Sequence, residues 1–118
     1  MAVFFVYATA GDAVEAQRIG RAAVEARLAA CATVIPGARS TYWWEGEVQE
    51  SPEAVLILKT TEAQLEALVQ RVKELHSYDC PCIEALPVQA GYPPFLDWVA
   101  RETQGSPAGE SDGLSDRG

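Results

Sequence analysis

The sequence predicts an α+β domain in which the elements follow the order β-α-β-β-α-β, with one more short helix at the end. Short apolar runs rich in β-branched and aromatic residues alternate with segments whose apolar residues recur at helical spacing. Two long strand-like segments meet at a tight turn, Glu45-Gly46, and therefore predict a hairpin. This order is that of the split βαβ, or ferredoxin-like, fold: an antiparallel sheet with both main helices on one face.

The first strand and the first helix are separated by a clear stop signal. Residues 2–10, AVFFVYATA, are aromatic and β-branched, and they end at Gly11-Asp12. Asp12 and Glu15 have the spacing of a helix capping box, and apolar residues then recur at helical spacing. We expect a central strand over residues 2–10 and a helix over residues 13–28.

The middle of the chain predicts a long, bent hairpin. Its first strand covers residues 31–44, and its second covers residues 47–60, where AVLILK is the stretch that looks most buried. Proline cannot donate to a strand ladder, so Pro36-Gly37 predicts a bulge or bend and Ser51-Pro52 a further irregularity.

The second half predicts another helix, a short strand and a terminal helix. Thr61 and Gln64 repeat the capping spacing ahead of a helix over residues 62–76. Residues 81–91 predict a further strand region. Pro93-Pro94 opens the last helix, because proline suits the first helical turn.

Composition marks a boundary near the end of the chain. Residues 104–118 consist largely of glycines, serines and acids, and Leu114 is their one sizeable apolar side chain. Such a segment buries too little surface to offset the entropy of ordering, so we expect it to be disordered. The prediction is therefore one domain, residues 1–103, followed by a tail.

Size, charge and cysteine content exclude several classes of protein. The chain has 118 residues and a net charge of −8, and its few basic residues are scattered, so no basic face serves nucleic acid. Apolar runs such as residues 54–58 are far too short to cross a bilayer, and the start of the chain has no basic segment followed by a long apolar stretch, so we expect no export signal. An odd number of cysteines, 3, argues against a secreted disulfide framework. We expect reduced thiols, a cytoplasmic location, and no nucleic-acid or membrane partner.

Three adjacent aromatic residues, Tyr42, Trp43 and Trp44, require a cover. Strand side chains alternate between faces, so Tyr42 and Trp44 point to one side and Trp43 to the other. The helices of one chain cover at most one of these sets, and an exposed apolar patch on a small protein commonly marks association. We interpret the block as a subunit interface. The alternatives are a hairpin tip that packs on its own base and a platform on which a ligand stacks.

Several ordered stretches resemble the CutA family of divalent-cation tolerance proteins. They include LAACATVIPG, YWWEG, LILKTT and ALPV, and the resemblance extends from about Ala2 to Thr103. It implies a ferredoxin-like subunit in a tight homotrimer whose long hairpins contribute to the contacts between subunits, similar in architecture to the trimeric PII signalling proteins. It also implies a role in tolerance of copper and other divalent metals.

The segment HSYDCPCIE holds the candidate metal ligands. His76 is the only histidine, and Cys80, Cys82 and Glu84 follow at period two, on one side of the segment if it is extended. Thiolates and imidazole suit Cu(I) or Zn(II). The same period separates the Cα atoms of Cys80 and Cys82 by about 6.6 Å, near the limit for a disulfide. The alternative is that the cysteines are small buried side chains and that His76 satisfies a helix C-terminus.

The resemblance supports this metal site in part. In the family, metal binding is ascribed to a cysteine at the end of the first strand and to the histidine after the second helix, which His76 matches. The first position is Ala8 in this chain, and alanine has no donor side chain. The family's metal site is therefore incomplete, and compensation by Cys80 or Cys82 is an open alternative.

No catalytic motif stands out in the sequence. A Cys-His hydrolase, with Cys31 or Cys80 as nucleophile and His76 as base, is the enzyme alternative, but no third orienting group is identifiable. Isolated basic residues such as Arg39 and Lys59 more commonly form surface ion pairs than anion sites. We expect a non-catalytic homotrimer that binds or senses metal, with copper or another divalent ion as possible ligand and no required cofactor. The alternative is a PII-like signalling or scaffold trimer that binds a small molecule or protein partner at its subunit clefts.

Overall fold

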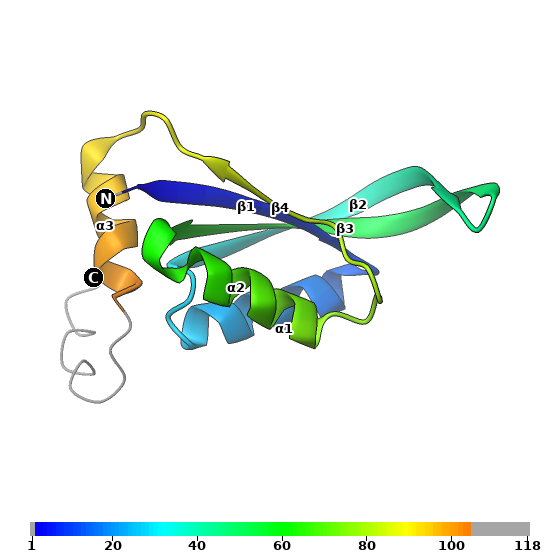
Figure 1. Ribbon diagram of the computed structural model, residues 1–118, viewed down its shortest axis with the longest axis horizontal. Helices are drawn as coiled ribbons and strands as arrows, with labels where there is room; N and C mark the ends of the chain where they lie inside the picture. The colour runs from blue at the N-terminus through cyan, green and yellow to red at the C-terminus, as the bar shows by residue number, and fades with distance from the viewer. Residues whose placement is uncertain (1, 105–118) are drawn as a thin grey trace.

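The protein is described by a computed structural model of residues 2–104, which contain one four-stranded sheet with two helices packed on one face (Figure 1). In chain order the elements are β1 Val3–Ala10, α1 Ala13–Glu25, β2 Cys31–Trp44, β3 Glu47–Thr61, α2 Glu62–Leu75, β4 Ile83–Pro87 and α3 Pro93–Glu102. The strands lie in the order β2-β3-β1-β4, and each neighbouring pair is antiparallel. The predicted α+β class, element order and antiparallel sheet are confirmed.

The hydrophobic core lies between the sheet and helices α1 and α2. The central strands β1 and β3 alternate, so that every second side chain faces the helices and is buried. The fully buried side chains that meet here are Val6, Ala8, Ile19, Leu56, Leu58, Leu68 and Val72. The opposite face of the same strands carries side chains that neither helix covers.

Helix α1 lies unusually close to the sheet at Gly20. A Cβ atom added to Gly20 would lie 2.9 Å from Ala32 Cβ and 3.1 Å from Leu56 Cδ1. The absence of a side chain at this position therefore sets how closely the helix approaches β2 and β3.

The first helix ends earlier than the sequence predicts, at Glu25 instead of residue 28. Arg27 adopts a φ of 63°, in the left-handed region, and the Leu28 N–H closes back onto the Ala23 carbonyl at 3.0 Å. Arginine is an unusual residue at such a position. Its guanidinium lies 2.7 Å from the Glu102 carboxylate, so a contact with α3 accompanies the termination of α1.

The two predicted capping motifs have different outcomes. At α1, the Asp12 side chain accepts the Glu15 N–H at 2.8 Å, as expected for an N-cap. At α2, Thr61 makes no side-chain cap bond, and the prediction is wrong. Gln64 Nε2 instead donates to the Thr103 carbonyl at 3.0 Å, and the Thr61 and Thr103 hydroxyls lie 3.4 Å apart. The side chains of Thr61 and Gln64 therefore contact Thr103, at the end of α3.

The hairpin of β2 and β3 is long and contains the predicted bulge. The register shifts between Ile35 and Ala38, so that Pro36 and Gly37 together oppose one residue of β3. The predicted irregularity at Ser51-Pro52 is wrong, because both residues pair with β2 in continuous register. β1 ends opposite Ala54, so β3 has a single neighbour at Pro52, and such a strand tolerates a missing N–H.

The far end of the hairpin projects beyond the rest of the sheet (Figure 1). β1 pairs with residues 54–61 of β3, whereas residues 47–53 pair with β2 alone. The aromatic block lies on this projecting part, where Tyr42, Trp43 and Trp44 are 40%, 74% and 51% exposed.

The last strand is shorter than expected, because β4 covers Ile83–Pro87 whereas the sequence predicts a strand region over 81–91. Residues 76–82 form a loop with bends, and α3 begins at the predicted proline pair. Within residues 2–104, no helix combines the length and the apolar character needed to cross a bilayer. The predicted disorder of the tail lies outside the described residues, apart from Gln104.

Candidate functional site

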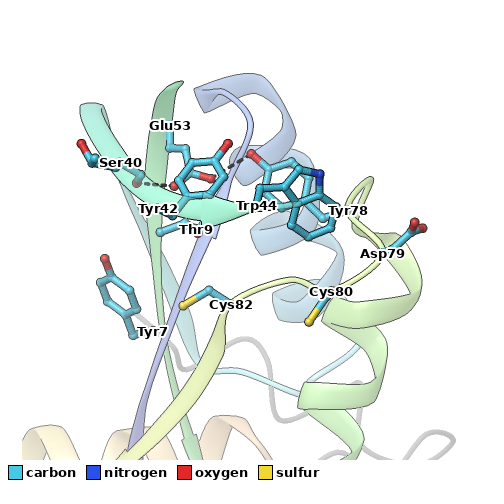
Figure 2. Close-up of a pocket in the computed structure, with 11 residues that line it drawn as sticks. Tyr7, Thr9, Ser40, Tyr42, Trp44, Glu53, Tyr78, Asp79, Cys80 and Cys82 are labelled. Carbon is cyan, nitrogen blue, oxygen red and sulfur yellow. Dashed lines mark hydrogen bonds between the residues drawn. The ribbon is translucent and has the colours of Figure 1, made fainter. Parts of the chain in front are cut away.

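A pocket of about 580 Å³ lies on the sheet face that α1 and α2 leave open. Tyr7 and Thr9 alternate along β1 with the buried core residues, so their side chains point to this open face. The hairpin supplies one wall and the loop between α2 and β4 supplies another (Figure 2). The lining residues are Tyr7, Thr9, Ser40, Thr41, Tyr42, Trp44, Glu53, Tyr78, Asp79, Cys80 and Cys82.

Glu53 is the most buried acid in the pocket, with 9% of the residue exposed. Its Oε1 accepts the Ser40 hydroxyl at 2.5 Å, and its Oε2 accepts the Tyr78 hydroxyl at 2.8 Å (Figure 2). Both partners are neutral donors, and the ion pairs found in residues 2–104 do not include Glu53. The pocket therefore contains a carboxylate that is hydrogen-bonded but has no opposite charge beside it.

Tyr78 joins the loop to the hairpin through this carboxylate. Partial burial, the hydrogen bond to Glu53 and the negative charge of that group raise the pKa of Tyr78 above the ordinary value of a phenol. Tyr78 therefore remains protonated near neutral pH and keeps its role as a donor to Glu53.

His76 is held at the start of the loop by both ring nitrogens, and its side chain is 1% exposed. Its Nε2 lies 2.7 Å from the Thr9 carbonyl oxygen, which only accepts, so Nε2 carries a hydrogen. Its Nδ1 lies 3.1 Å from the backbone nitrogen of Tyr78, which only donates, so Nδ1 accepts. The imidazole therefore bridges β1 and the loop. Nε2 carries a hydrogen, and the lone pair of Nδ1 accepts a hydrogen bond, so neither nitrogen offers a lone pair to a metal ion in the pocket.

Glu15, the third residue of α1, fixes the same loop from the helix side. Its carboxylate accepts the Ser77 N–H at 2.8 Å and the Gly11 N–H at 3.1 Å, and it lies 3.7 Å from His76 Nδ1. Burial opposes ionisation of this acid, but the hydrogen bonds from Ser77 and Gly11 hold the pKa of Glu15 below its ordinary value. A charged Glu15 thus stabilises the loop that forms one wall of the pocket.

Cys80 and Cys82 are free thiols on the loop wall, and both line the pocket. The chain bends at residues 77–80, and β4 begins only at Ile83, so Glu84 is the one member of the predicted ligand set that lies in a strand. Cys82 Sγ donates to Glu84 Oε1 at 3.9 Å. Burial, followed by the negative charges of Glu84 and Glu53, raises the pKa of the Cys82 thiol.

The four predicted metal ligands occupy two places around the loop. Cys80 and Cys82 line the pocket, with Glu84 in contact with Cys82, whereas His76 faces Thr9 and the loop backbone. In the described part of the chain, no three or more His, Cys, Asp or Glu side chains are grouped so as to hold a metal ion. Cys31 lies at the start of β2, outside the lining of this pocket.

Sequence reasoning missed the residue set around Glu53. Ser40, Glu53 and Tyr78 come from three segments that are 13 and 25 residues apart along the chain. One signal was present in the sequence. Glu53 is an acid directly before the apolar stretch of β3, and side-chain alternation along the strand fixes the face to which it points. A carboxylate at this position of a buried strand requires a polar partner from another segment, because burying it without a hydrogen bond is unfavourable.

The aromatic block is divided between two surfaces. Tyr42 and Trp44 line the pocket, and Tyr42 Oη lies 3.2 Å from Ser51 Oγ. Trp43 is on the other side of the hairpin, where it pairs in register with the exposed Val48. The alternation predicted from the sequence is therefore present, and it gives the two sides different surroundings.

Comparison with known proteins gives consistent sequence matches. A family model for the CutA1 divalent ion tolerance protein matches residues 4–102. The chain is 47% identical over 88 residues to the divalent-cation tolerance protein CutA of Thermus thermophilus, covering 75% of this chain and 85% of that protein. It is 41% identical over 101 residues to the chloroplastic protein CutA 1 of Oryza sativa, covering 86% of this chain and 57% of that protein. The chain thus spans little more than half of this rice relative.

Solved structures agree with the sequence matches. The crystal structure of CutA1 from Oryza sativa has a TM-score of 0.86 at 39% identity, covering 90% of this chain and 97% of that chain. The structure of the divalent cation tolerance protein from Thermus thermophilus has a TM-score of 0.83 at 42% identity, covering 86% of this chain and 98% of that chain. The match of fold, family model and relatives confirms the resemblance noted in the sequence: the chain belongs to the CutA1 family of divalent ion tolerance proteins.

Proposed function

We propose that this protein acts in divalent-cation tolerance as a homotrimer of ferredoxin-like subunits, and that it binds copper or another divalent ion without catalysing a reaction. The observation that carries the metal part is the thiol pair Cys80 and Cys82, which lines an acidic pocket next to Glu84. Thiolates favour soft metal ions, and Cu(I) is the ion that two thiolates and few other ligands suit best.

His76 enters this proposal as a conditional ligand. Its Nδ1 accepts the Tyr78 N–H and its Nε2–H donates to Thr9. To bind a metal at Nδ1, the imidazole must release the Tyr78 N–H, which would free the loop that carries Cys80. The complete ligand set proposed is His76, Cys80, Cys82 and Glu84, with the cysteines as the primary pair.

The ferredoxin-like class is supported by the strand order. The chain runs β-α-β-β-α-β before α3, and the strands lie in the order β2-β3-β1-β4. The two strands that follow helices, β2 and β4, are thereby placed at the two edges, and β1 and β3 occupy the centre.

The homotrimer is supported by exposed apolar side chains on the open sheet face and the hairpin. Ile35, Leu86, Trp43 and Val48 are all large, apolar and exposed. A second copy of the chain that covers them would remove apolar area from water, which favours association. We propose that Tyr42, Trp43 and Trp44 contact neighbouring subunits, with Trp43 the side chain that depends on them most.

The cytoplasmic location is part of the same proposal. Cys80 and Cys82 are free thiols near the surface, and such thiols persist in a reducing compartment. A fractionation experiment with thiol labelling before lysis checks this location.

Anaerobic titration with Cu(I) tests the metal site. We expect the wild-type chain to bind Cu(I), the Cys80→Ser, Cys82→Ser variant to lose most of its affinity, and Cys31→Ser, outside the pocket lining, to match the wild type. A His76→Ala variant that binds Cu(I) as well as the wild type removes His76 from the ligand set. Equal binding by the wild type and the double cysteine variant refutes the site.

Light scattering tests the assembly separately. The wild type is expected at three times the chain mass, and Trp43→Glu is expected to dissociate or misfold, because the charge would be buried without a partner. A matched substitution at the exposed Glu50, Glu50→Gln, should leave the mass unchanged. A wild-type monomer at micromolar concentration contradicts the trimer.

A PII-like signalling or scaffold trimer is the second candidate. The observation in its favour is the pocket of about 580 Å³, a size that suits a small molecule. This candidate requires saturable binding of an organic ligand, whereas metal tolerance requires binding of the ion.

A further inference from the structure

The pocket has an acidic and aromatic lining with no basic side chain. The charged residues among its described lining are Glu53 and Asp79, and lysine, arginine and histidine do not occur in that set. Aromatic rings form much of the remaining wall. From this combination we propose that the pocket binds a small organic cation, a ligand class separate from the metal ion assigned to Cys80 and Cys82.

Glu53 provides the buried acid of the pocket. The carboxylate is largely buried, accepts two neutral hydroxyls, and takes part in no ion pair within residues 2–104. A buried charge without an opposite charge is unfavourable, and a cation that enters the pocket would provide one. Each carboxylate oxygen accepts more than one hydrogen bond, so the two hydroxyls do not exhaust Glu53.

Aromatic side chains line the pocket together with Glu53. Tyr42 and Trp44 lie on the hairpin side of the pocket and Tyr78 on the loop side (Figure 2). A cation above the face of an aromatic ring is attracted by the ring's negative face, and tryptophan gives the strongest attraction. The same rings provide apolar contacts for the methyl or methylene groups of an organic cation, which a hydrated metal ion cannot use.

Other ligand classes fit the pocket lining less well than an organic cation. An anion would meet two carboxylates, while the Ser40 and Tyr78 hydroxyls already donate to Glu53. The metal ion proposed above is assigned to the thiols of Cys80 and Cys82, and it makes no use of the aromatic rings of Tyr42 and Trp44. The volume of about 580 Å³ is within the range of small-molecule sites. A quaternary or alkylated ammonium ion of modest size therefore fits best.

Binding of choline to the full chain tests this proposal, with 3,3-dimethylbutan-1-ol as the uncharged analogue of the same shape. Calorimetry measures affinity, and a change in tryptophan fluorescence that is absent in Trp44→Leu reports on Trp44, one of 3 tryptophans in the chain. We expect choline to bind at least about tenfold more tightly than the neutral analogue, because the positive charge contributes to both interactions. Equal affinity for the two probes, or no saturable choline binding, overturns the proposal.

Two acid-to-amide variants test whether choline binds beside Glu53. Glu53→Gln keeps the shape and removes the charge, so we expect choline affinity to fall at least about tenfold. The matched control is Glu50→Gln, an acid on the same strand whose side chain is 62% exposed and lies outside the pocket lining; its affinity should be unchanged. Equal losses in both variants would show a general charge effect and refute the site.

Two further variants separate this site from folding defects and from the metal site. Trp44 is 51% exposed within the single chain, and Trp44→Leu keeps an apolar side chain for the proposed subunit contact. The variant should therefore retain the circular dichroism spectrum and the assembly mass of the wild type and lose at least about fivefold in choline affinity. The Cys80→Ser, Cys82→Ser variant should retain choline binding even though it loses Cu(I). Loss of choline binding in the cysteine variant, or its full retention in Trp44→Leu, contradicts the proposed organic-cation site.

Discussion

The Nε2–H of His76 donates a 2.7 Å hydrogen bond to the backbone carbonyl of Thr9, and this bond ties the start of the α2–β4 loop to β1. Thr9 itself lines the pocket, and the loop forms the wall that carries the two cysteines. The only histidine of the chain thus holds the pocket wall in place, whether or not it also binds metal.

Replacing His76 should destabilise the protein. His76→Ala leaves the Thr9 carbonyl and the Tyr78 N–H without their partner, so we expect the free energy of unfolding to fall by about 1–3 kcal/mol. Urea unfolding at a fixed protein concentration measures this loss. Lys73→Ala, at an exposed site on α2, is the control and should change stability by less than about 0.5 kcal/mol. A loss in His76→Ala no larger than in the control contradicts the structural role.

Glu15 should make stability depend on pH in the acidic range. Because the pKa of Glu15 is lower in the folded chain than its ordinary value, its contribution is fully present above the unfolded pKa. That contribution disappears as the pH falls from the ordinary glutamate pKa of 4.5 through the lower folded pKa, so the loss occurs below about pH 5. Unfolding midpoints across this range should decline less steeply for Glu15→Gln than for the wild type. Parallel curves for the two chains would show that Glu15 does not contribute.

Arg27 and Glu102 should be energetically coupled. Their charged groups lie 2.7 Å apart, and the side chain of Glu102 is 10% exposed. Removing Arg27 leaves the largely buried Glu102 with only the Arg101 guanidinium, at 3.9 Å, among the described residues, so Arg27→Met is expected to cost up to about 3 kcal/mol. Arg27→Met with Glu102→Gln should cost less than the sum of the two single changes. Denaturant unfolding of the four chains completes the double-mutant cycle. Additive effects would show that the contact is energetically silent.

Gly20 should not accept a side chain. The added Cβ of Gly20→Ala would lie 2.9 Å from Ala32 Cβ and 3.1 Å from Leu56 Cδ1, and both of these side chains belong to the packed layer between helix and sheet. Overpacking of this kind destabilises by about 1–3 kcal/mol, even though alanine favours helix more than glycine does. Gln17→Ala, at an exposed position on the same helix, is expected to be neutral or slightly stabilising. Thermal unfolding of both variants decides the point, and a rise in stability for Gly20→Ala would disprove the close approach.

Cu(I) affinity should increase with pH. The pKa of the Cys82 thiol is raised, so near neutral pH the metal must displace a proton from the sulfur. Each thiol that binds as thiolate contributes about a tenfold increase in affinity per pH unit below its pKa. Anaerobic competition titrations between about pH 6 and about pH 8 should therefore give a steeper slope for the wild type than for Cys82→Ser. A slope that is unchanged in Cys82→Ser shows that Cys82 is not a ligand.

Much of the fold was predictable because its signals are local. Alternating or helical spacing of apolar residues identifies β1, α1, the β2–β3 hairpin and α2, and the capping pattern at Asp12 marks the start of α1. The bulge at Pro36-Gly37 was equally readable, because proline removes a ladder donor whatever the neighbouring strand is.

Elements whose ends depend on distant contacts were predicted less well. α1 ends where Arg27 adopts a left-handed backbone conformation and contacts Glu102, 75 residues away. No glycine at this position marks the end of the helix in the sequence. Thr61 and Gln64 have the spacing of a capping motif, yet their side chains contact Thr103 once α3 packs against the start of α2. The capping pattern is the same in both helices, and the difference comes from what lies next to each.

The candidate site was likewise predictable only in part from the sequence. The sequence by itself determined that Tyr42 and Trp44 face one side of the hairpin and Trp43 the other, because strand alternation is a property of the backbone. Only the tertiary structure decided that Tyr42 and Trp44 share a pocket with Glu53, because residues from separate strands and a loop meet when the sheet forms. It also decided that His76 faces Thr9, since the loop bends where an extended segment would have aligned it with the cysteines. Local pattern sets which way a side chain points, whereas packing between distant segments sets what it meets.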